Sequence, residues 1–365
     1  MTTKLVVENI KDKPMRSLLS FLLIGVPVTL ILTLQGLSSG MLNDAKERAK
    51  GVGADLMVRA SSATMAVQQS TEALSEKYVS YFRNEVPHVK LATGVMNRAI
   101  EFPLYITGID PVEFNKMSGG FTYLQGRGLR DPDDILVDDL YARQKKLHIG
   151  SAVQLKNHDW RLVGIIAGGK LARVVVSLPA LQHVLSTGPE VTQIYVKLDD
   201  PRNSDAVVQF IKENTSLTVN TMDEFTALYS VNNVPGLSDF MYVVMGIGVV
   251  IGFAVVCLSM YMAVLQRTRE IGILKAIGGS KSFILRLILA EAMVLALGGT
   301  VLGILMSFGA WWLIRTLVPS SLSIMIVPAW WPIAGAITLV AAGLGALYPG
   351  LSAARHDPIE ALAYE

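Results

Sequence analysis

The chain has 365 residues, of which 51% are hydrophobic and only 17% are charged, whereas a soluble domain usually carries about 25% charged residues. This composition argues against a single soluble globule and favours a membrane protein. The formal net charge is only +2, and no nucleic-acid-binding motif is present, so we expect no nucleic-acid partner. The single cysteine, Cys257, lies in an apolar run and cannot form an intramolecular disulfide.

Four apolar runs are each long enough to cross a bilayer, which takes about 20 residues. They predict transmembrane helices at residues 17–43, 239–265, 283–315 and 330–350. An alternative for the first run is a cleaved signal peptide, because a basic leader precedes it. Its apolar stretch, Leu18 to Leu37, is longer than the roughly 7 to 15 residues of such peptides, which favours a span.

Basic residues near the spans predict the orientation, because short positively charged loops stay in the cytoplasm. These residues are Lys4, Lys11, Lys13 and Arg16 before the first run, and Arg267, Arg269, Lys275, Lys281 and Arg286 between the second and third runs. We therefore expect cytoplasmic segments at residues 1–16, 266–282 and 351–365, with both termini in the cytoplasm. Residues 44–238 and the loop 316–329 are expected on the external side.

Residues 44–238 are less apolar and contain many Gly and Pro turn signals, as expected of a water-facing domain. Short β-rich runs predict strands at residues 55–59, 104–109, 152–155, 161–166, 173–178 and 193–198. Helical spacing predicts helices at residues 70–84, 139–147 and 204–214. The sequence thus predicts a large α+β domain inserted between transmembrane helices 1 and 2.

Motifs for catalysis or metal binding are missing from the sequence. Residues Gly164 to Lys170 match part of a phosphate-binding loop, but Leu171 stands where Ser or Thr is required, and a β-rich run follows instead of a helix. The five histidines do not have the spacing of zinc ligands, and no nucleophile motif occurs. We expect no catalytic residue, metal or cofactor in this chain.

The stretch from Gln266 to Glu291 is the most informative part of the sequence. Ile271, Leu274 and Ile277 recur at three-residue spacing beside charged residues, which predicts an amphipathic helix. Gly278-Gly279 would end this helix, and Ser280 or Ser282 would cap the next one. On this pattern alone, a helix lying on membrane lipid headgroups is one interpretation.

Three segments resemble one family. Residues 267–278, RTREIGILKAIG, followed by Phe283-Ile-Leu-Arg-Leu and Glu291, resemble the signature loop of the MacB/FtsX-type ABC-transporter permeases. Residues 9–19 are similar to the amphipathic segment that leads into that family's first span, and residues 348–362 resemble its closing motif. In the external segment, residues 107–110, 126–127 and 163–165 are similar to a MacB-like periplasmic domain.

The resemblance implies a permease of the bacterial inner membrane that works as a dimer, with a second copy or a related permease. Two ABC ATPase subunits would bind ATP and Mg. MacB carries its ATPase on the same chain, and here we expect it on a separate polypeptide. ATP-driven closure would move the external domain and so export or extract a substrate, with a periplasmic adaptor as a further partner. The alternatives are an FtsX-like regulator of an envelope enzyme and a receptor without an ATPase.

The resemblance also assigns a docking site for the ATPase. An apolar stripe of the coupling helix would enter a groove on the ATPase, with Arg and Glu forming charge-assisted bonds at the rim. The expected docking residues are Arg267, Arg269, Glu270, Ile271, Leu274, Lys275, Ala276 and Gly278. The tail residues expected beside them are Asp357, Pro358, Glu360 and Leu362.

Two features lie inside the spans. Glu291 is about one turn into the third span, where a carboxylate is costly, and we expect it to pair with Arg286, with Lys281 or with a partner subunit. A role in gating or ligand contact is the alternative. Small residues one turn apart predict close helix packing, within the subunit or across a dimer; they are Gly248 with Gly252 and Gly299 with Gly303.

Overall fold

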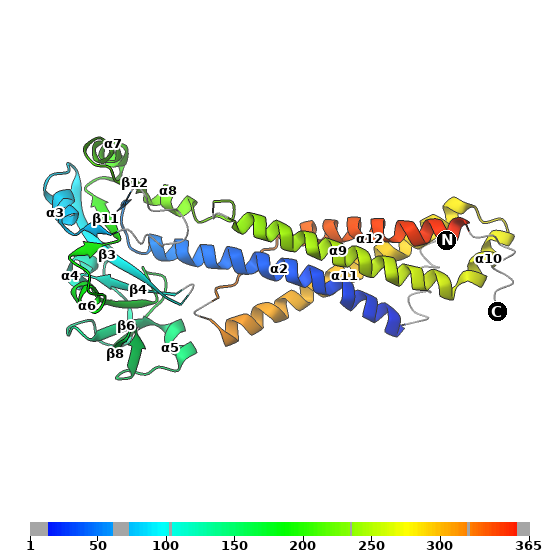
Figure 1. Cartoon of the computed structure of the whole chain (residues 1–365), viewed down its shortest axis with the longest axis horizontal. Helices are drawn as coiled ribbons and strands as arrows, with labels where there is room; N and C mark the ends of the chain where they lie inside the picture. The colour runs from blue at the N-terminus through cyan, green and yellow to red at the C-terminus, as the bar shows by residue number, and fades with distance from the viewer. Residues whose placement is uncertain (1–13, 61–72, 102–103, 234–235, 320–321, 356–365) are drawn as a thin grey trace. The chain divides into compact units, whose positions relative to one another are not determined.

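The computed structural model describes residues 14–60, 73–101, 104–233, 236–319 and 322–355. These residues form two compact units (Figure 1). The helical unit contains the chain up to residue 38, residues 238–313 and the chain from residue 324 onward. The sheet unit contains residues 39–237 and 314–323. Two of the boundaries, after residues 38 and 313, fall inside long helices, so each of these helices contributes residues to both units.

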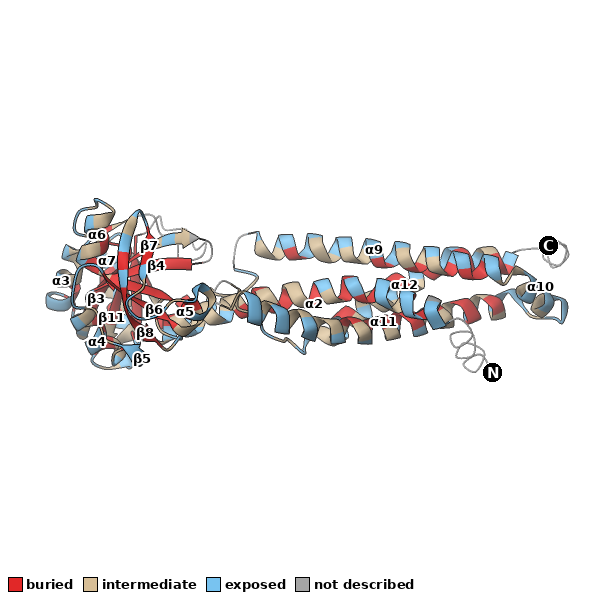
Figure 2. Ribbon diagram, turned by 90° about the horizontal axis from the view of Figure 1, so that it is seen from below, coloured by how far each residue is buried: buried red, intermediate tan, exposed pale blue. Residues whose placement is uncertain are grey.

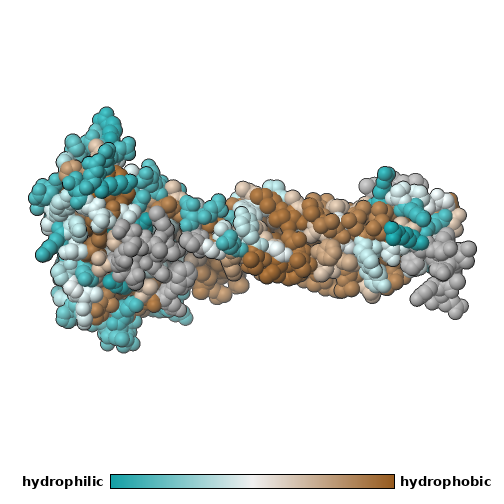
Figure 3. All heavy atoms as spheres, turned by 45° about the horizontal axis from the view of Figure 1, so that its top comes forward, coloured by the Kyte–Doolittle hydropathy of each residue, from teal (hydrophilic) through white to brown (hydrophobic). Residues whose placement is uncertain are grey.

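Four long helices are apolar enough to cross a membrane among the described residues. They are α2 (Pro14–Lys50), α9 (Leu237–Gln266), α11 (Lys281–Leu317) and α12 (Trp330–Arg355). A short helix, α10 (Thr268–Ala276), connects α9 to α11. On the face drawn in Figure 3, hydrophobic residues predominate along the middle of the helical unit. These helices confirm the four predicted spans.

Small residues let α2 and α11 approach closely within the helical unit. A Cβ atom added to Gly299 would lie 2.6 Å from Cγ2 of Ile24. One added to Gly303 would lie 2.8 Å from the carbonyl oxygen of Gly25. The hydroxyl of Thr29 also donates a hydrogen bond of 3.0 Å to the carbonyl of Gly303. Gly299 and Gly303 therefore pack inside the subunit, one of the two alternatives left open by their spacing.

The other pair of glycines, on α9, makes a looser contact. A Cβ atom at Gly248 would lie 3.4 Å from Cδ1 of Ile31, and at Gly252 it would meet no atom of the described residues within 4 Å. A small gap between α2, α9 and α12 borders both glycines. The close approach to α9 is made instead by Gly345 of α12, where a Cβ atom would lie 2.7 Å from the carbonyl oxygen of Phe253.

The sheet unit is built on a mixed sheet. Its strands are β1 (Leu56–Arg59), β3 (Val89–Glu101), β4 (Leu104–Ile109), β5 (Tyr123–Gly126), β6 (Asp134–Asp138), β7 (Ala152–Leu155), β8 (His158–Ile166), β9 (Val174–Ser177), β11 (Gln193–Leu198) and β12 (Thr218–Thr221). Their order is β12-β1-β11-β3-β4-β9-β6-β8-β5, and β7 also pairs with β8. The β4–β9 and β6–β8 pairs are parallel, and the other neighbours are antiparallel. The short strands β2 (Leu74–Ser75) and β10 (Glu190–Val191) form a separate pair.

Helices cover both faces of this sheet, whose strands are largely buried (Figure 2). They are α3 (Lys77–Asn84), α4 (Pro111–Ser118), α5 (Asp139–Lys145), α6 (Leu178–Val184), η1 (Pro201–Asn203), α7 (Ser204–Asn214) and α8 (Met222–Ala227). Successive residues of β1 and β9 enter two different hydrophobic clusters, because side chains alternate across a strand. One cluster contains Trp160 and Phe82, and the other contains Phe114. The predicted α+β domain after the first span is thereby confirmed.

Candidate functional site

The helix α10 is delimited by local backbone chemistry. At its start, the hydroxyl of Thr268 donates to the carbonyls of Val264 and Leu265 at 3.1 and 2.9 Å, at the point where α9 ends. At its end, Gly278 has φ +102, and the amide of Gly279 bonds the carbonyl of Leu274 at 2.9 Å. This is the glycine-dependent Schellman ending, which satisfies carbonyls of the last turn.

The next helix starts immediately afterwards. The hydroxyl of Ser280 accepts a hydrogen bond of 3.2 Å from the amide of Phe283 and so caps α11. Ser280 is thus the capping residue, one of the two that the sequence offered. The glycine ending of α10 and this cap leave only a short turn between α10 and α11.

The two faces of α10 have different surroundings. Gly272 is buried, and Ile271 and Leu274 are half-buried and pack against the core of the helical unit. The opposite face carries the exposed residues Arg269, Ile273, Ala276 and Ile277, followed by Gly278. Glu270 is also exposed and lies at the border between the two faces. Ile273 and Ile277 are 43% and 80% exposed. The outer face therefore combines charged side chains with two large apolar ones.

The structure divides the expected docking residues between these faces. Arg269, Glu270, Ala276 and Gly278 are exposed, as a docking surface requires, whereas Ile271 and Leu274 lie on the inner face. Ile273 was missed by the sequence analysis. The available signal was its position four residues after Arg269, which places both side chains on the same side of a helix.

Two of the expected docking residues instead attach α10 to other helices. Nη1 of Arg267 lies 3.4 Å from Oε2 of Glu291 on α11, and both side chains are mostly buried, at 14% and 12% exposed. Nζ of Lys275 donates a hydrogen bond of 3.1 Å to the carbonyl of Ala354, in the last turn of α12. Lysine at such a position satisfies a carbonyl that has no partner within its own helix. The two ends of α10 are therefore fastened to two different spans.

The partner of Glu291 in the structure is Arg267, and not Arg286 or Lys281 as we expected. Arg286 lies five residues before Glu291 on the same helix, so their side chains point about 140° apart. Arg286 and Lys281 are both exposed, whereas Glu291 is turned toward α10. An ion pair across two helices thus replaces the expected pair along one helix.

A cavity of about 100 Å³ lies beside this ion pair. Its walls are mainly aliphatic, with Arg267, Glu270 and Glu291 supplying the charged groups. The remaining lining residues are Met260, Ala263, Val264, Ile271, Leu274, Ile284, Leu287 and Ile288, from α9, α10 and α11. Packing between α10 and the long helices is therefore incomplete on this side. The expected tail residues 357–362 lie outside the described residues.

The segment that partly matches a phosphate-binding loop has a different role. Gly164 lies within β8, and the chain continues from Lys170 into β9. Nζ of Lys170 donates to the carbonyls of Ser118 and Gly120 at 2.8 and 2.5 Å, at the C-terminal end of α4. The segment is a connection between strands whose lysine binds backbone carbonyls, so it lacks the strand-to-helix geometry of a nucleotide site.

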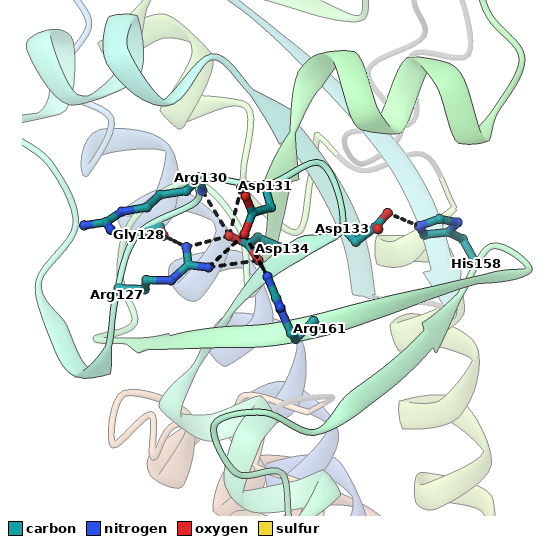
Figure 4. A network of polar contacts seen from close by, with 8 residues as sticks. All are labelled: Arg127, Gly128, Arg130, Asp131, Asp133, Asp134, His158 and Arg161. Carbon is teal, nitrogen blue, oxygen red and sulfur yellow. Dashed lines mark hydrogen bonds and ion pairs between the residues drawn. The ribbon is translucent and has the colours of Figure 1, made fainter.

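The Gly126-Arg127 segment contributes to a polar network around Asp134 (Figure 4). Nη1 of Arg127 lies 2.6 Å and Nη2 of Arg161 lies 3.0 Å from the fully buried carboxylate of Asp134. The amides of Arg130 and Asp131 donate to the same carboxylate at 3.0 Å each. Burial alone would raise the pKa of Asp134, but these hydrogen bonds outweigh it and lower the pKa to about 2. The network fixes the turn that leads into β6.

Comparison with known proteins agrees with this architecture. Residues 17–214 match the family of the MacB-like periplasmic core domain, and residues 242–358 match the FtsX-like permease C-terminal family. The macrolide export ATP-binding/permease protein MacB of Photorhabdus laumondii is 26% identical and covers 96% of this chain. An uncharacterized ABC transporter permease of Methanocaldococcus jannaschii is 23% identical, covering 98% of this chain and 96% of its own length.

Among solved structures, the periplasmic region of MacB from Actinobacillus actinomycetemcomitans is 13% identical, with a TM-score of 0.37 over 48% of this chain and 92% of that chain. The chain spans 59% of the length of the Photorhabdus protein. The first family model alone covers more than half of the chain, and the second covers the three later spans and α10. The chain therefore belongs to the MacB/FtsX-type ABC-transporter permeases.

Proposed function

We propose that this chain is the membrane subunit through which an ABC ATPase moves an extracytoplasmic domain, driving export or extraction of a substrate. The ATPase, in two copies, binds ATP and Mg and docks on the outer face of α10. Two copies of this chain, or this chain and a related permease, complete the complex. The observation that carries the proposal is the division of α10 into an exposed outer face and an inner face fastened to α11 and α12.

The outer face of α10 suits a groove on another protein. Ile273 and Ile277 offer apolar area that is costly to leave in water, and Arg269 and Glu270 flank them with groups that form oriented, charge-assisted bonds. Movement of the ATPase would then reach α11 through Arg267 and Glu291, and α12 through Lys275. In this proposal, the substrate contacts the extracytoplasmic domain or an adaptor bound to that domain.

Charge reversal on the outer face tests the docking. The double variant Arg269→Glu, Glu270→Lys should weaken binding of the copurifying ATPase by about tenfold or more, which corresponds to about 1.4 kcal/mol. The matched control is Asp139→Arg, Arg143→Asp, which reverses an exposed ion pair on α5 and should leave copurification unchanged. Unchanged ATPase binding in the α10 variant, with the protein still folded, would contradict the proposal.

The proposal includes an orientation, with α10 and both termini in the cytoplasm and the sheet unit outside. One serine of each unit can report it after Cys257 is replaced by Ala: Ser280 is exposed and Ser204 is half-buried. A membrane-impermeant thiol reagent applied to intact cells should label Ser204→Cys at the start of α7 and should not reach Ser280→Cys beside α10. Labelling of Ser280→Cys with protection of Ser204→Cys would reverse the orientation and remove α10 from the reach of a cytoplasmic ATPase.

A further inference from the structure

A buried guanidinium joins several segments of the sheet unit that are far apart in sequence. Nη1 of Arg173 lies 2.6 Å from Oδ2 of Asp138, and Nη2 of the same side chain lies 2.8 Å from Oδ2 of Asp44 on α2. Nη2 also donates to the hydroxyl of Ser323 at 3.1 Å. The side chain of Arg173 is 4% exposed and that of Asp138 is 2% exposed. One arginine thus contacts α2, the end of β6 and the segment after α11.

Each partner is itself fixed to an element. Asp138 accepts a hydrogen bond of 2.7 Å from the amide of Tyr141, so its carboxylate caps α5 while it binds Arg173. Asp44 also pairs with Arg48, one turn further along α2, at 2.6 Å. The backbone amide of Leu171, two residues before Arg173, donates to the carbonyl of Arg48 at 2.9 Å. The contact between α2 and the β8–β9 connection is therefore made by both side chains and backbone.

Two of the segments at Arg173 belong to or follow helices that the two units share. Residues of α2 and of α11 belong to both units, and Ser323 follows the end of α11 within the sheet unit. At its other end, α11 begins after α10 and carries Glu291, the partner of Arg267. Arg173 thus contacts α2 directly at Asp44, and it contacts Ser323, six residues after the end of α11.

A guanidinium is suited to such a junction. It is planar, it is always charged, and its fixed fork of donors can bind several acceptors at once, which the single ammonium of lysine cannot do with the same geometry. Because the guanidinium binds several acceptors, it stays paired with the two carboxylates when the Ser323 hydroxyl is lost, and the remaining contacts are expected to rearrange together. A displacement of one partner of Arg173 would therefore shift the other partners.

We propose that Arg173 is the positioning residue through which α2 and the segment after α11 act together on the extracytoplasmic sheet, by way of Asp138 and α5. The inference rests on the proposed function, because it specifies where the movement of the spans enters the extracytoplasmic domain. Ser323 connects Arg173 to the segment after α11, and Asp44 connects Arg173 to α2. A purely structural role of Arg173 would stabilise the sheet unit equally in every state of the ATPase.

The test uses the full chain with its copurifying ATPase in lipid vesicles. Hydrogen–deuterium exchange is measured at residues 134–146 and 172–178, with and without Mg and a non-hydrolysable ATP analogue. In the unmodified complex, nucleotide should change exchange in both segments. Ser323→Ala should reduce that nucleotide-dependent difference by about threefold or more, while nucleotide-free exchange stays unchanged. Ser323→Thr keeps the hydroxyl and should retain the difference.

Ser151→Ala is the matched control, because the hydroxyl of Ser151 binds an exposed turn of the same unit, at the amide of His148. It should respond to nucleotide like the unmodified complex. A normal response in Ser323→Ala, or an equal loss in Ser323→Ala and Ser323→Thr, would overturn the inference while the proposed function stands. Raised nucleotide-free exchange with an intact nucleotide response would also overturn it and assign a purely structural role. If nucleotide changes nothing in the unmodified complex, the proposed function and the inference both fail.

Discussion

The sheet unit and the helical unit differ in the contacts that join distant parts of the chain. In the sheet unit, arginines bound to the buried carboxylates of Asp134 and Asp138 do so. In the helical unit, α2 and α11 meet through backbone contacts at Gly299 and Gly303. Helices in lipid gain little from burying apolar side chains against each other, so close packing of small residues has to supply the attraction. The same chain thus uses two kinds of connection in two surroundings.

The helix α10 departs from this division. It belongs to the helical unit, yet its inner side is held by an ion pair and by a lysine–carbonyl hydrogen bond. The contact between Arg267 and Glu291, at 3.4 Å, is longer than the 2.6 Å contact between Arg173 and Asp138. Since charge-assisted hydrogen bonds are strongest at about 2.7 to 2.9 Å, the α10 contact should be weaker and more easily broken. If α10 moves in each ATPase cycle, as we propose, a weaker connection is easier to break and to form again.

The largest effect is expected at Arg173. Arg173→Met removes the charge and leaves the carboxylates of Asp138 and Asp44 facing an apolar group, which should cost the sheet unit about 3 to 5 kcal/mol. The measurement is the opening free energy of amides in β6 and β9, obtained from native-state hydrogen exchange of the full chain in detergent micelles.

The control for Arg173→Met is Arg143→Met, which removes an arginine from an exposed pair and should change the opening free energy by less than about 1 kcal/mol. Adding Asp138→Asn to Arg173→Met removes the uncompensated buried charge, keeps an oxygen for the cap of α5, and should recover part of the loss. If Arg173→Met lowers the opening free energy no more than Arg143→Met does, the buried ion pairs of Arg173 do not stabilise the sheet unit more than an exposed pair does.

A smaller loss is expected at Asp134. Because its folded pKa is lowered to about 2, Asp134 adds stability that is complete above the unfolded-state pKa of about 3.9 and is lost as pH falls toward 2. Asp134→Asn should therefore cost about 2 kcal/mol at neutral pH, and the deficit should shrink between about pH 5 and pH 2. Thermal unfolding of both forms of the full chain across this range measures the deficit.

For Asp134→Asn, the matched control is Asp133→Asn, whose side chain is 64% exposed and contacts His158. It should cost less than about 0.5 kcal/mol at neutral pH, as substitutions on the surface usually do. A deficit of Asp134→Asn that stays constant across the acidic range would mean that its carboxylate is not held ionised by Arg127 and Arg161.

The sequence predicted the elements that have strong local patterns. Strands 104–109, 152–155 and 193–198 and the helix 204–214 have the predicted bounds, because β-branched runs and helical spacing mark them. The long strand β3 was missed, since its residues 89–101 include Gly94 and several polar side chains. Its stability comes from pairing with β11 and β4 on both sides, and that information is not local.

The sequence predicted the short helix α10 but not which of its side chains face inward. A spacing of three residues moves each side chain about 60° back around a helix, so Ile271 and Ile277 point about 120° apart. Ile271 therefore packs inward while Ile277 is 80% exposed. The members of the Arg173 junction come from positions 44, 138, 173 and 323, which no local pattern connects.

The close contact of α2 with α11 gives the third prediction. Gly303→Ala would place a Cβ atom 2.8 Å from the carbonyl of Gly25, which cannot move without displacing α2. The expected cost is about 1 to 3 kcal/mol, as for other overpacked sites. The control is Gly309→Ala on the same helix, where no atom of the described residues lies within 4 Å and alanine should be neutral or stabilising by up to about 1 kcal/mol. Equal unfolding midpoints of the two variants in detergent would contradict close packing as the connection between α2 and α11.

The smallest effect on stability is expected at Glu291, where α10 meets α11. Glu291→Gln keeps the shape of the side chain and its hydrogen-bonding oxygen. It removes only the charge facing Arg267 across a long contact of 3.4 Å, so the loss should be about 1 kcal/mol, the scale of a single hydrogen bond. The Glu291 and Arg173 contacts can then be compared by their effects on coupling to nucleotide as well as by their effects on stability. If the α10 contact transmits movement, Glu291→Gln should leave the unfolding midpoint and ATPase binding almost unchanged, yet lower the effect of nucleotide on hydrogen exchange in the sheet unit. A cost close to that of Arg173→Met would instead indicate a rigid buried ion pair between α10 and α11. The Arg267–Glu291 contact would then be no weaker than the Arg173–Asp138 contact.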